Sequence, residues 1–163
     1  MPDAVKPNPT RILFVCLGNI CRSPLAEAIV RERALVRRLD RQFCFASAGT
    51  GDWHVGSGAD VRSAATARAH GTDLSAHRAR QITPSGTSHW HWFVAMDKNN
   101  KKDLLAMGVN SACVLMMRQF EPENHEPPDV PDPYYGGEDG FENIYRLLEA
   151  NADPLLDYLI ANA

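Results

Sequence analysis

The sequence predicts a single α/β domain, built on a small parallel sheet with helices on both faces. A chain of 163 residues that is 44% hydrophobic and 23% charged fits one domain with a sizeable core. Continuous apolar runs, typical of strands buried on both faces, alternate with segments whose apolar residues follow helical spacing. Residues 1–9 contain three prolines and are expected to be a flexible tail, which leaves residues 10–163 as the domain.

The first strand and the helix after it are expected at the start of the domain. Residues 10–16 form a strand, because the apolar run at 12–15 is typical of a central strand in a parallel sheet. A helix follows, since the first helical turn tolerates Pro24 and Ser23 is a suitable N-cap. The segment between them is predicted to be a short loop that joins strand 1 to helix 1.

The remaining elements alternate in the same way. A second strand is expected at 42–48, and a helix at 59–70 stops at Gly71, a good residue for a left-handed C-terminal cap. The later elements are a strand at 92–96, a helix capped by Asp97 that runs to Met107, a strand at 112–117, a long loop at 121–133, and a closing helix over 141–159 that is kinked or restarted at Pro154. In such a doubly wound sheet, ligands bind beyond the carboxyl ends of the strands.

A cysteine and an arginine flank the loop after the first strand. Cys16 ends the strand, and Arg22 stands six positions later at the start of the helix. Backbone N–H groups in turns and at helix N-termini bind anions and favour the nucleophilic thiolate of a cysteine. A planar arginine fork holds two phosphoryl oxygens at once. Cys16 is therefore predicted to attack phosphorus. The predicted phosphate-binding residues are Leu17, Gly18, Asn19, Ile20, Cys21, Arg22 and Ser23.

The spacing of this pair is weak evidence by itself. The alternative is a buried cysteine at a strand end and an exposed arginine on a helix. The context favours a phosphate loop, because the pair encloses Gly18 and Asn19, which tolerate unusual backbone angles. The loop lacks the Gly-Lys-Ser/Thr ending of nucleotide-binding loops, which disfavours ATP and GTP.

The leaving oxygen of a phosphate ester needs a proton, and Asp132 is the best candidate to supply it. Pro131 and Pro133 stiffen the backbone on both sides of this residue, and its loop follows the last strand. Ordinary turn chemistry is the alternative interpretation of the Asp-Pro and Gly-Gly pairs here. Asp129 is a second carboxylate in the same loop.

Two segments together resemble those of the low-molecular-weight protein tyrosine phosphatase family. VCLGNICRSP at 15–24 and DPYYGG at 132–137 match the family's phosphate loop and acid loop in kind and in order. The resemblance extends from Arg11 to the last helix. It implies a four-stranded parallel sheet in strand order 2-1-3-4, and neither a metal nor another cofactor. It also implies three catalytic residues: Cys16 as nucleophile, Arg22 as the clamp for the phosphate and the transition state, and Asp132 as general acid and then base.

Further residues gain roles from the resemblance. Asn19 and Ser23 would fix the loop and stabilise the thiolate, together with Ser47. The substrate's aryl ring would lie between Trp53, Tyr134 and Tyr135, each of which is otherwise a half-buried packing aromatic. Relatives similar to protein arginine phosphatases carry threonine in place of Ile20, so isoleucine favours phosphotyrosine. His77 either supports the phosphate loop from behind or lies on the surface in a basic turn.

The other three cysteines and two of the histidines could have redox or metal-binding roles, or could simply be structural. The resemblance implies that Cys21 forms a reversible disulfide with the nucleophile, and the alternative is a loop residue packed inward. Cys44 and Cys113 are expected to be inert core thiols within strands. His89 and His91 would share one strand face, but two ligands without a clear third argue against a metal site.

Composition narrows the classes of partner. A net charge of −3 argues against broad binding to nucleic acid or an anionic membrane, and no apolar run reaches the roughly 18 residues of a membrane span. Four cysteines favour a reducing compartment, most simply the cytoplasm, although secretion without a cleavable signal stays open. The expected protein is a monomer that acts on phosphotyrosine-containing proteins. Two rivals are an arsenate reductase, which needs mobile thiols that reach Cys16, and a non-catalytic phosphopeptide-binding module.

Overall fold

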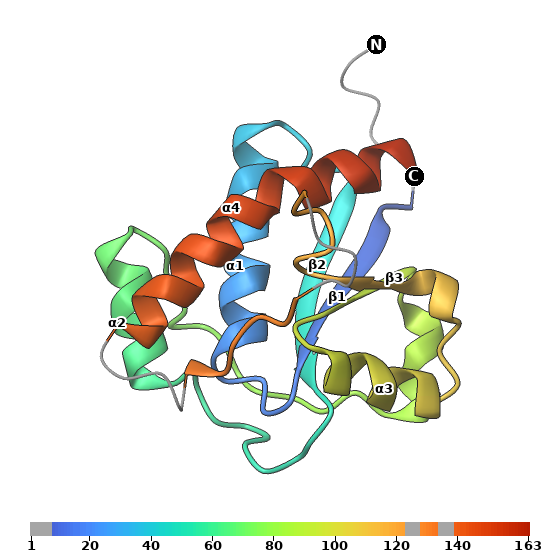
Figure 1. The fold of residues 1–163 in the computed structure, drawn as a ribbon, viewed down its shortest axis with the longest axis horizontal. Coiled ribbons are helices and arrows are strands. Elements are labelled where there is room, and N and C mark those ends of the chain that lie inside the picture. Colours follow the sequence, from blue (N-terminus) through green and yellow to red (C-terminus); the bar gives the residue numbers. More distant parts are fainter. Residues whose placement is uncertain (1–7, 123–127, 134–138) are drawn as a thin grey trace.

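The computed structural model describes residues 8–122, 128–133 and 139–163. Within these ranges, strands and helices alternate as the sequence predicts (Figure 1). In chain order they are β1 (Thr10–Cys16), α1 (Arg22–Val36), β2 (Phe43–Gly49), α2 (Val61–Ala69), the 3-10 helix η1 (Pro84–His89), β3 (Trp92–Ala95), α3 (Lys98–Ala106), the 3-10 helix η2 (Ser111–Cys113), β4 (Val114–Met116) and α4 (Gly140–Ala161). Most of the predicted tail lies outside the described residues, so its flexibility stays a prediction.

The four strands form one parallel sheet in the order β2-β1-β3-β4. This confirms the predicted order 2-1-3-4 and the α/β class. β1 pairs with β2 along its whole length, from Thr10 opposite Phe43 to Cys16 opposite Gly49. Because parallel strands end at the same edge of a sheet, Cys16 emerges beside the carboxyl ends of its neighbours, where such folds bind ligands.

β1 buries side chains on both faces of the sheet, which explains its continuous apolar run. Ile12 and Phe14 pack into a large core with residues of α1 and α4, whereas Leu13 and Val15 pack into a smaller core with Leu104 of α3. None of these side chains is accessible to solvent. Figure 1 shows α1, α2 and α4 on one side of the sheet and α3 on the other.

Several predicted boundaries and caps differ from the structure. The prediction that Ser23 caps α1 is wrong, because α1 begins at Arg22 and Ser23 lies inside its first turn. Pro154 lies within the single helix α4, so the helix does not restart there. β4 is shorter than the predicted strand, since residues 111–113 form η2. Asp97 does cap α3, and Gly71 follows α2 with a φ of +85°.

Cys44 and Cys113 are not the buried strand thiols that the sequence predicts. Cys44 lies on β2 but is exposed, because β2 is an edge strand and α3 contacts the distant β3 and β4. Cys113 ends η2 and is half-buried. His89 ends η1 and His91 precedes β3, so neither lies in a strand.

Among the described residues, no three His, Cys, Asp or Glu side chains form a group that could hold a metal ion. No helix within the described ranges is long and apolar enough to cross a membrane.

Candidate active site

The loop between β1 and α1 wraps around the sulfur of Cys16. Asn19 has a φ of 56°, in the left-handed region that asparagine tolerates better than most residues. This conformation turns the Asn19 N–H toward the sulfur, at 3.2 Å from Cys16 Sγ. Gly49 lets β2 approach the loop, since a Cβ at this position would lie 2.7 Å from the Leu17 carbonyl oxygen.

The carbonyl groups of this loop are bound from outside. The Cys16 carbonyl accepts a hydrogen bond from the Thr50 N–H at 3.0 Å, and the Ile20 carbonyl accepts one from the Asp60 N–H at 2.9 Å. His77 Nε2 donates to the carbonyl oxygen of Asn19 at 2.7 Å, so His77 contacts the loop from outside. Because these acceptors are occupied from outside, the loop is free to present backbone N–H groups to an anion.

A chain of side-chain hydrogen bonds leads to the thiol. Ser23 Oγ lies 3.0 Å from Cys16 Sγ and accepts a hydrogen bond from Asn19 Nδ2 at 2.8 Å. Asn19 Nδ2 also donates to Ser47 Oγ at 3.0 Å, while the Arg80 N–H donates to Asn19 Oδ1 at 3.0 Å and thereby fixes the amide orientation. Since Ser23 Oγ already accepts a hydrogen bond from Asn19, its own hydrogen is available to the sulfur. Asn19, Ser23 and Ser47 are therefore joined in one hydrogen-bond network beside the Cys16 thiol.

Arg22 is held against the pocket by two partners. Its Nη1 donates to Asp97 Oδ2 at 2.8 Å and to the Val130 carbonyl oxygen at 3.0 Å. Burial disfavours the charged guanidinium, but the neighbouring sulfur of Cys16 and the carboxylate of Asp97 outweigh it and raise the pKa of Arg22. Both bonds to described residues use Nη1, which leaves Nε and Nη2 to bind two oxygens of an anion.

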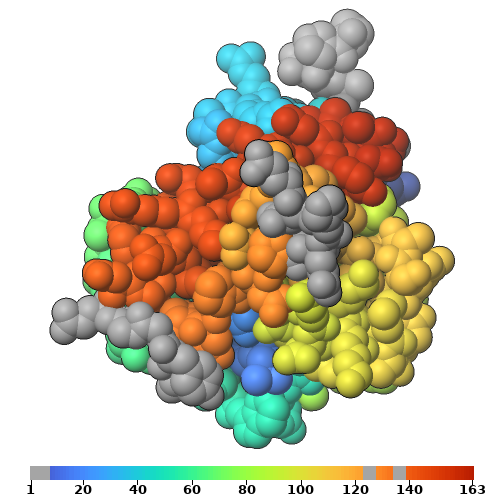
Figure 2. Space-filling model, viewed as in Figure 1, coloured from blue at the N-terminus to red at the C-terminus, as the bar shows by residue number. Residues whose placement is uncertain are grey.

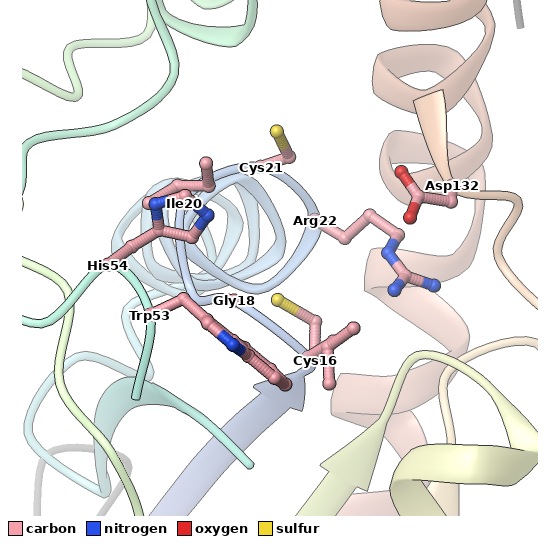
Figure 3. Close-up of a pocket in the computed structure, with 9 residues that line it drawn as sticks. Cys16, Gly18, Ile20, Cys21, Arg22, Trp53, His54 and Asp132 are labelled. Carbon is pink, nitrogen blue, oxygen red and sulfur yellow. The ribbon is translucent and has the colours of Figure 1, made fainter. Parts of the chain in front are cut away.

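Cys16 and Arg22 line the same pocket (Figure 3). Its described lining residues are Cys16, Leu17, Gly18, Ile20, Cys21, Arg22, Trp53, His54 and Asp132. Figure 3 shows Trp53 and His54 on one side of Cys16, with Arg22 and Asp132 on the other. The Trp53 ring lies against Gly51, where a Cβ would come within 1.9 Å of it, and is 70% exposed. Tyr134 and Tyr135 lie outside the described residues.

The structure distinguishes the two candidate carboxylates and the two cysteines. Asp132 lines the pocket, whereas Asp129 accepts a hydrogen bond from the Lys98 N–H at the start of α3.

Burial, together with the charges of Asp60 and Cys16, raises the pKa of the Cys21 thiol to about 12. Cys21 therefore stays protonated near neutral pH, and Figure 3 shows its sulfur on the side of the loop away from Cys16.

The chain matches a family model described as low molecular weight phosphotyrosine protein phosphatase, over residues 11–163. The chain belongs to this family. It is 42% identical to "Low molecular weight protein-tyrosine phosphatase A" of Mycobacterium tuberculosis, over 93% of both chains. It is 43% identical to the "Low molecular weight protein-tyrosine-phosphatase" of Streptomyces coelicolor, over 90% of this chain and 91% of that one. The crystal structure of YfkJ from Bacillus subtilis superposes with a TM-score of 0.88 at 32% identity, covering 96% of this chain and 98% of that one.

The chain is thus a tyrosine phosphatase of the cysteine-dependent type that is typical of this family. The sequence analysis missed two residues, one that holds Arg22 and one that lines the pocket. Asp97 binds Arg22, but the two residues lie 75 positions apart in the sequence, so the local sequence around Asp97 indicated only that it caps α3. His54 lines the pocket beside Gly18, and its only sequence signal was its place next to Trp53.

Proposed function

We propose that this phosphatase uses Cys16, Arg22 and Asp132 to hydrolyse phosphotyrosine through a phosphocysteine intermediate. One observation carries the proposal. The sulfur of Cys16 lies within hydrogen-bond distance of two donors, Ser23 Oγ and the Asn19 N–H, in a pocket that also holds a buried arginine and a carboxylate. These are the groups that phosphoryl transfer to a thiolate requires.

In the first step, the Cys16 thiolate attacks phosphorus and the bond from phosphorus to the tyrosine oxygen breaks. The electron pair of that bond goes to the leaving oxygen, which takes a proton from Asp132. Nε and Nη2 of Arg22 hold two peripheral oxygens of the phosphoryl group as its charge shifts. The hydroxyl of Ser23 and the N–H of Asn19 stabilise the thiolate before attack.

In the second step, water attacks the phosphocysteine and the sulfur–phosphorus bond breaks. Asp132, now a carboxylate, accepts a proton from this water, and Cys16 leaves as the thiolate that Ser23 stabilises. Inorganic phosphate is released, so the enzyme returns to its starting protonation state. The step needs no redox partner.

The substrate's aryl ring is proposed to lie against Trp53, with Tyr134 and Tyr135 completing the cleft. Trp53 supports this role because it lines the pocket and exposes most of its ring to solvent. Ile20 lines the same pocket and favours an apolar phenol over a charged guanidinium group. Since the nucleophile must stay reduced and all four cysteines are unpaired, we further propose that the protein works in a reducing compartment, the cytoplasm. We also propose that it acts as a monomer.

Arsenate reduction fits these residues less well. A resolving thiol must reach the nucleophile, but Cys44 pairs with Arg11 near the start of β1, while Cys16 pairs with Gly49 at its end. Cys113 comes directly before β4, so it lies at the amino ends of the strands, whereas the pocket lies at their carboxyl ends. A phosphopeptide-binding module would not need the general acid that Asp132 supplies.

The test compares hydrolysis of p-nitrophenyl phosphate and phenyl phosphate in the presence of a chelator. Cys16→Ser is expected to abolish turnover, while Cys44→Ser leaves it unchanged. Asp132→Asn is expected to slow turnover by up to about 10²–10⁴-fold, most strongly for phenyl phosphate, whose oxygen is the poorer leaving group. Asp129→Asn is the matched control and keeps full activity on both compounds. Full activity of Cys16→Ser, or equal losses for both aspartate variants, would refute the assignment.

A further inference from the structure

A second groove opens beside the catalytic pocket and shares Leu17, Arg22 and Asp132 with it. Its volume is about 380 Å³. In Figure 2, the blue surface of the phosphate loop lies between the orange surface before α4 and the yellow-green surface of α3. We call this hollow, between the phosphate loop, the start of α3 and residues 129–132, the α3 groove.

Part of the lining of the α3 groove is apolar. Leu17, Val130 and Pro131 line it. Leu17 is 44% exposed although it belongs to the phosphate loop, and Pro131 is also exposed. An aliphatic chain that leaves the catalytic pocket on this side would bury part of this apolar surface.

The remaining wall of the α3 groove carries carboxylates. Asp103 faces it from α3 and Asp129 from the segment that follows β4. Asp129 is fixed in place, because its Oδ1 accepts from the Lys98 N–H at 3.0 Å and its carbonyl accepts from Arg118 at 2.8 Å. Arg22 is the only cation among the described lining residues, and its charge is matched by Asp97 at 2.8 Å. The charge left in the groove is negative.

We propose that the α3 groove binds a lysine or arginine side chain of the substrate, a few residues from the phosphotyrosine. This inference rests on the proposed function, because it takes the phosphoryl group to lie beside Cys16. Lysine and arginine combine a long aliphatic stem with a charged head. The stem matches the apolar stretch at Leu17 and Pro131, and the head matches Asp103 and Asp129. The groove thus selects phosphotyrosine sites with a basic flank.

The experiment uses phosphotyrosine peptides that carry Arg, Ala or Glu at one of three positions on either side of the phosphotyrosine. We expect Arg to raise kcat/KM over Glu by about two- to tenfold at one or two positions, the range for partly exposed charge pairs. The preference should shrink at high salt, which screens such pairs. Equal kcat/KM for all three peptides at every position, or a preference for Ala over Arg, would overturn the proposal.

Variants of the groove separate this inference from the catalytic assignment. Asp103→Asn should reduce the preference for Arg about two- to threefold, and Asp103→Lys should reverse it in favour of Glu. Glu149→Gln removes the same charge from an exposed position on α4 and should leave the preference intact. Asp103 does not line the catalytic pocket that binds p-nitrophenyl phosphate, so hydrolysis of this compound should not change in the Asp103 variants.

Each failure has its own signature. A parent enzyme that hydrolyses neither p-nitrophenyl phosphate nor any peptide contradicts the proposed function. Full activity with an unchanged preference in Asp103→Lys contradicts the α3 groove alone. If Asp103→Lys does not fold, Asp129→Asn replaces it, because its remaining amide oxygen still accepts from the Lys98 N–H. An unaltered preference for Arg in Asp129→Asn then overturns the inference.

Discussion

Replacing Asp97 with asparagine is expected to lower kcat, although Asp97 does not line the catalytic pocket. Asp97 Oδ2 accepts from Arg22 Nη1 at 2.8 Å, and the two side chains are only 16% and 6% exposed. Asp97 Oδ1 separately accepts from the Asn100 N–H and caps α3. Asparagine keeps the cap, since it is as good an N-cap as aspartate, but it removes the charged partner of Arg22.

The size of the effect follows from this one contact. A hydrogen bond to a charged group contributes about 1.5–3 kcal/mol. If the transition state loses that much because Arg22 is no longer held in place, kcat falls about 10- to 150-fold. KM is not expected to rise, because the loss of a negative charge near the pocket favours binding of the phosphate dianion. A decrease in kcat without an increase in KM is therefore the expected pattern.

Initial rates with p-nitrophenyl phosphate and urea unfolding together test this reasoning. Asp97→Ala should show the same loss in kcat and should also unfold more easily than Asp97→Asn by about 1 kcal/mol, the usual cost of a lost cap. Asn110→Ala removes a cap from η2, away from the pocket, and should leave kcat unchanged. A kcat of Asp97→Asn within twofold of the parent value would show that Arg22 does not depend on this partner.

Gly49→Ala is expected to lower both stability and kcat/KM, because its Cβ would lie 2.7 Å from the backbone of the phosphate loop; an unchanged urea midpoint would contradict this. Iodoacetamide near neutral pH is expected to modify Cys16 and spare Cys21, whose pKa burial raises to about 12 and which therefore stays protonated. Peptide mass spectrometry gives the site, and rapid labelling of Cys21 would refute that reasoning. Leu148→Ala, at a fully buried position, should lower the free energy of unfolding by about 2–5 kcal/mol in urea, while Leu35→Ala, at a position 62% exposed, should change it little.

The sequence was sufficient for the fold because local patterns and global packing agree. The unbroken apolar run of β1 corresponds to a central strand covered on both faces. The same pattern misleads at the edge of the sheet. Cys44 stands between two aromatic residues of β2, which resembles a buried strand, but α3 packs against β3 and β4 rather than against this edge strand, and the thiol is exposed.

The sequence predicts the loop between β1 and α1 as the candidate phosphate loop, but it predicts only some of the contacts that support this loop. Cys16 and Arg22 are close in the chain, and the segment between them has a distinctive composition. The contact between Arg22 and Asp97 depends on how α1 and α3 meet across the sheet, which no local pattern encodes. The local sequence predicts that Ser23 caps the helix, because serine favours that position, whereas the family resemblance implies a place beside the thiol. In the structure its hydroxyl instead lies 3.0 Å from the thiol, so the helix N-terminus keeps unpaired N–H groups for an anion.

The anchoring of Val130 limits how the proposed proton donor, Asp132, can move. Its N–H donates to the Met96 carbonyl at 2.7 Å, and its own carbonyl accepts from Arg22 at 3.0 Å. Asp132 follows only two residues later, a tether of about 7 Å when fully extended. In the proposed mechanism, the reach of Asp132 is therefore set by the short peptide that follows Val130, which is bonded to the backbone just beyond the end of β3.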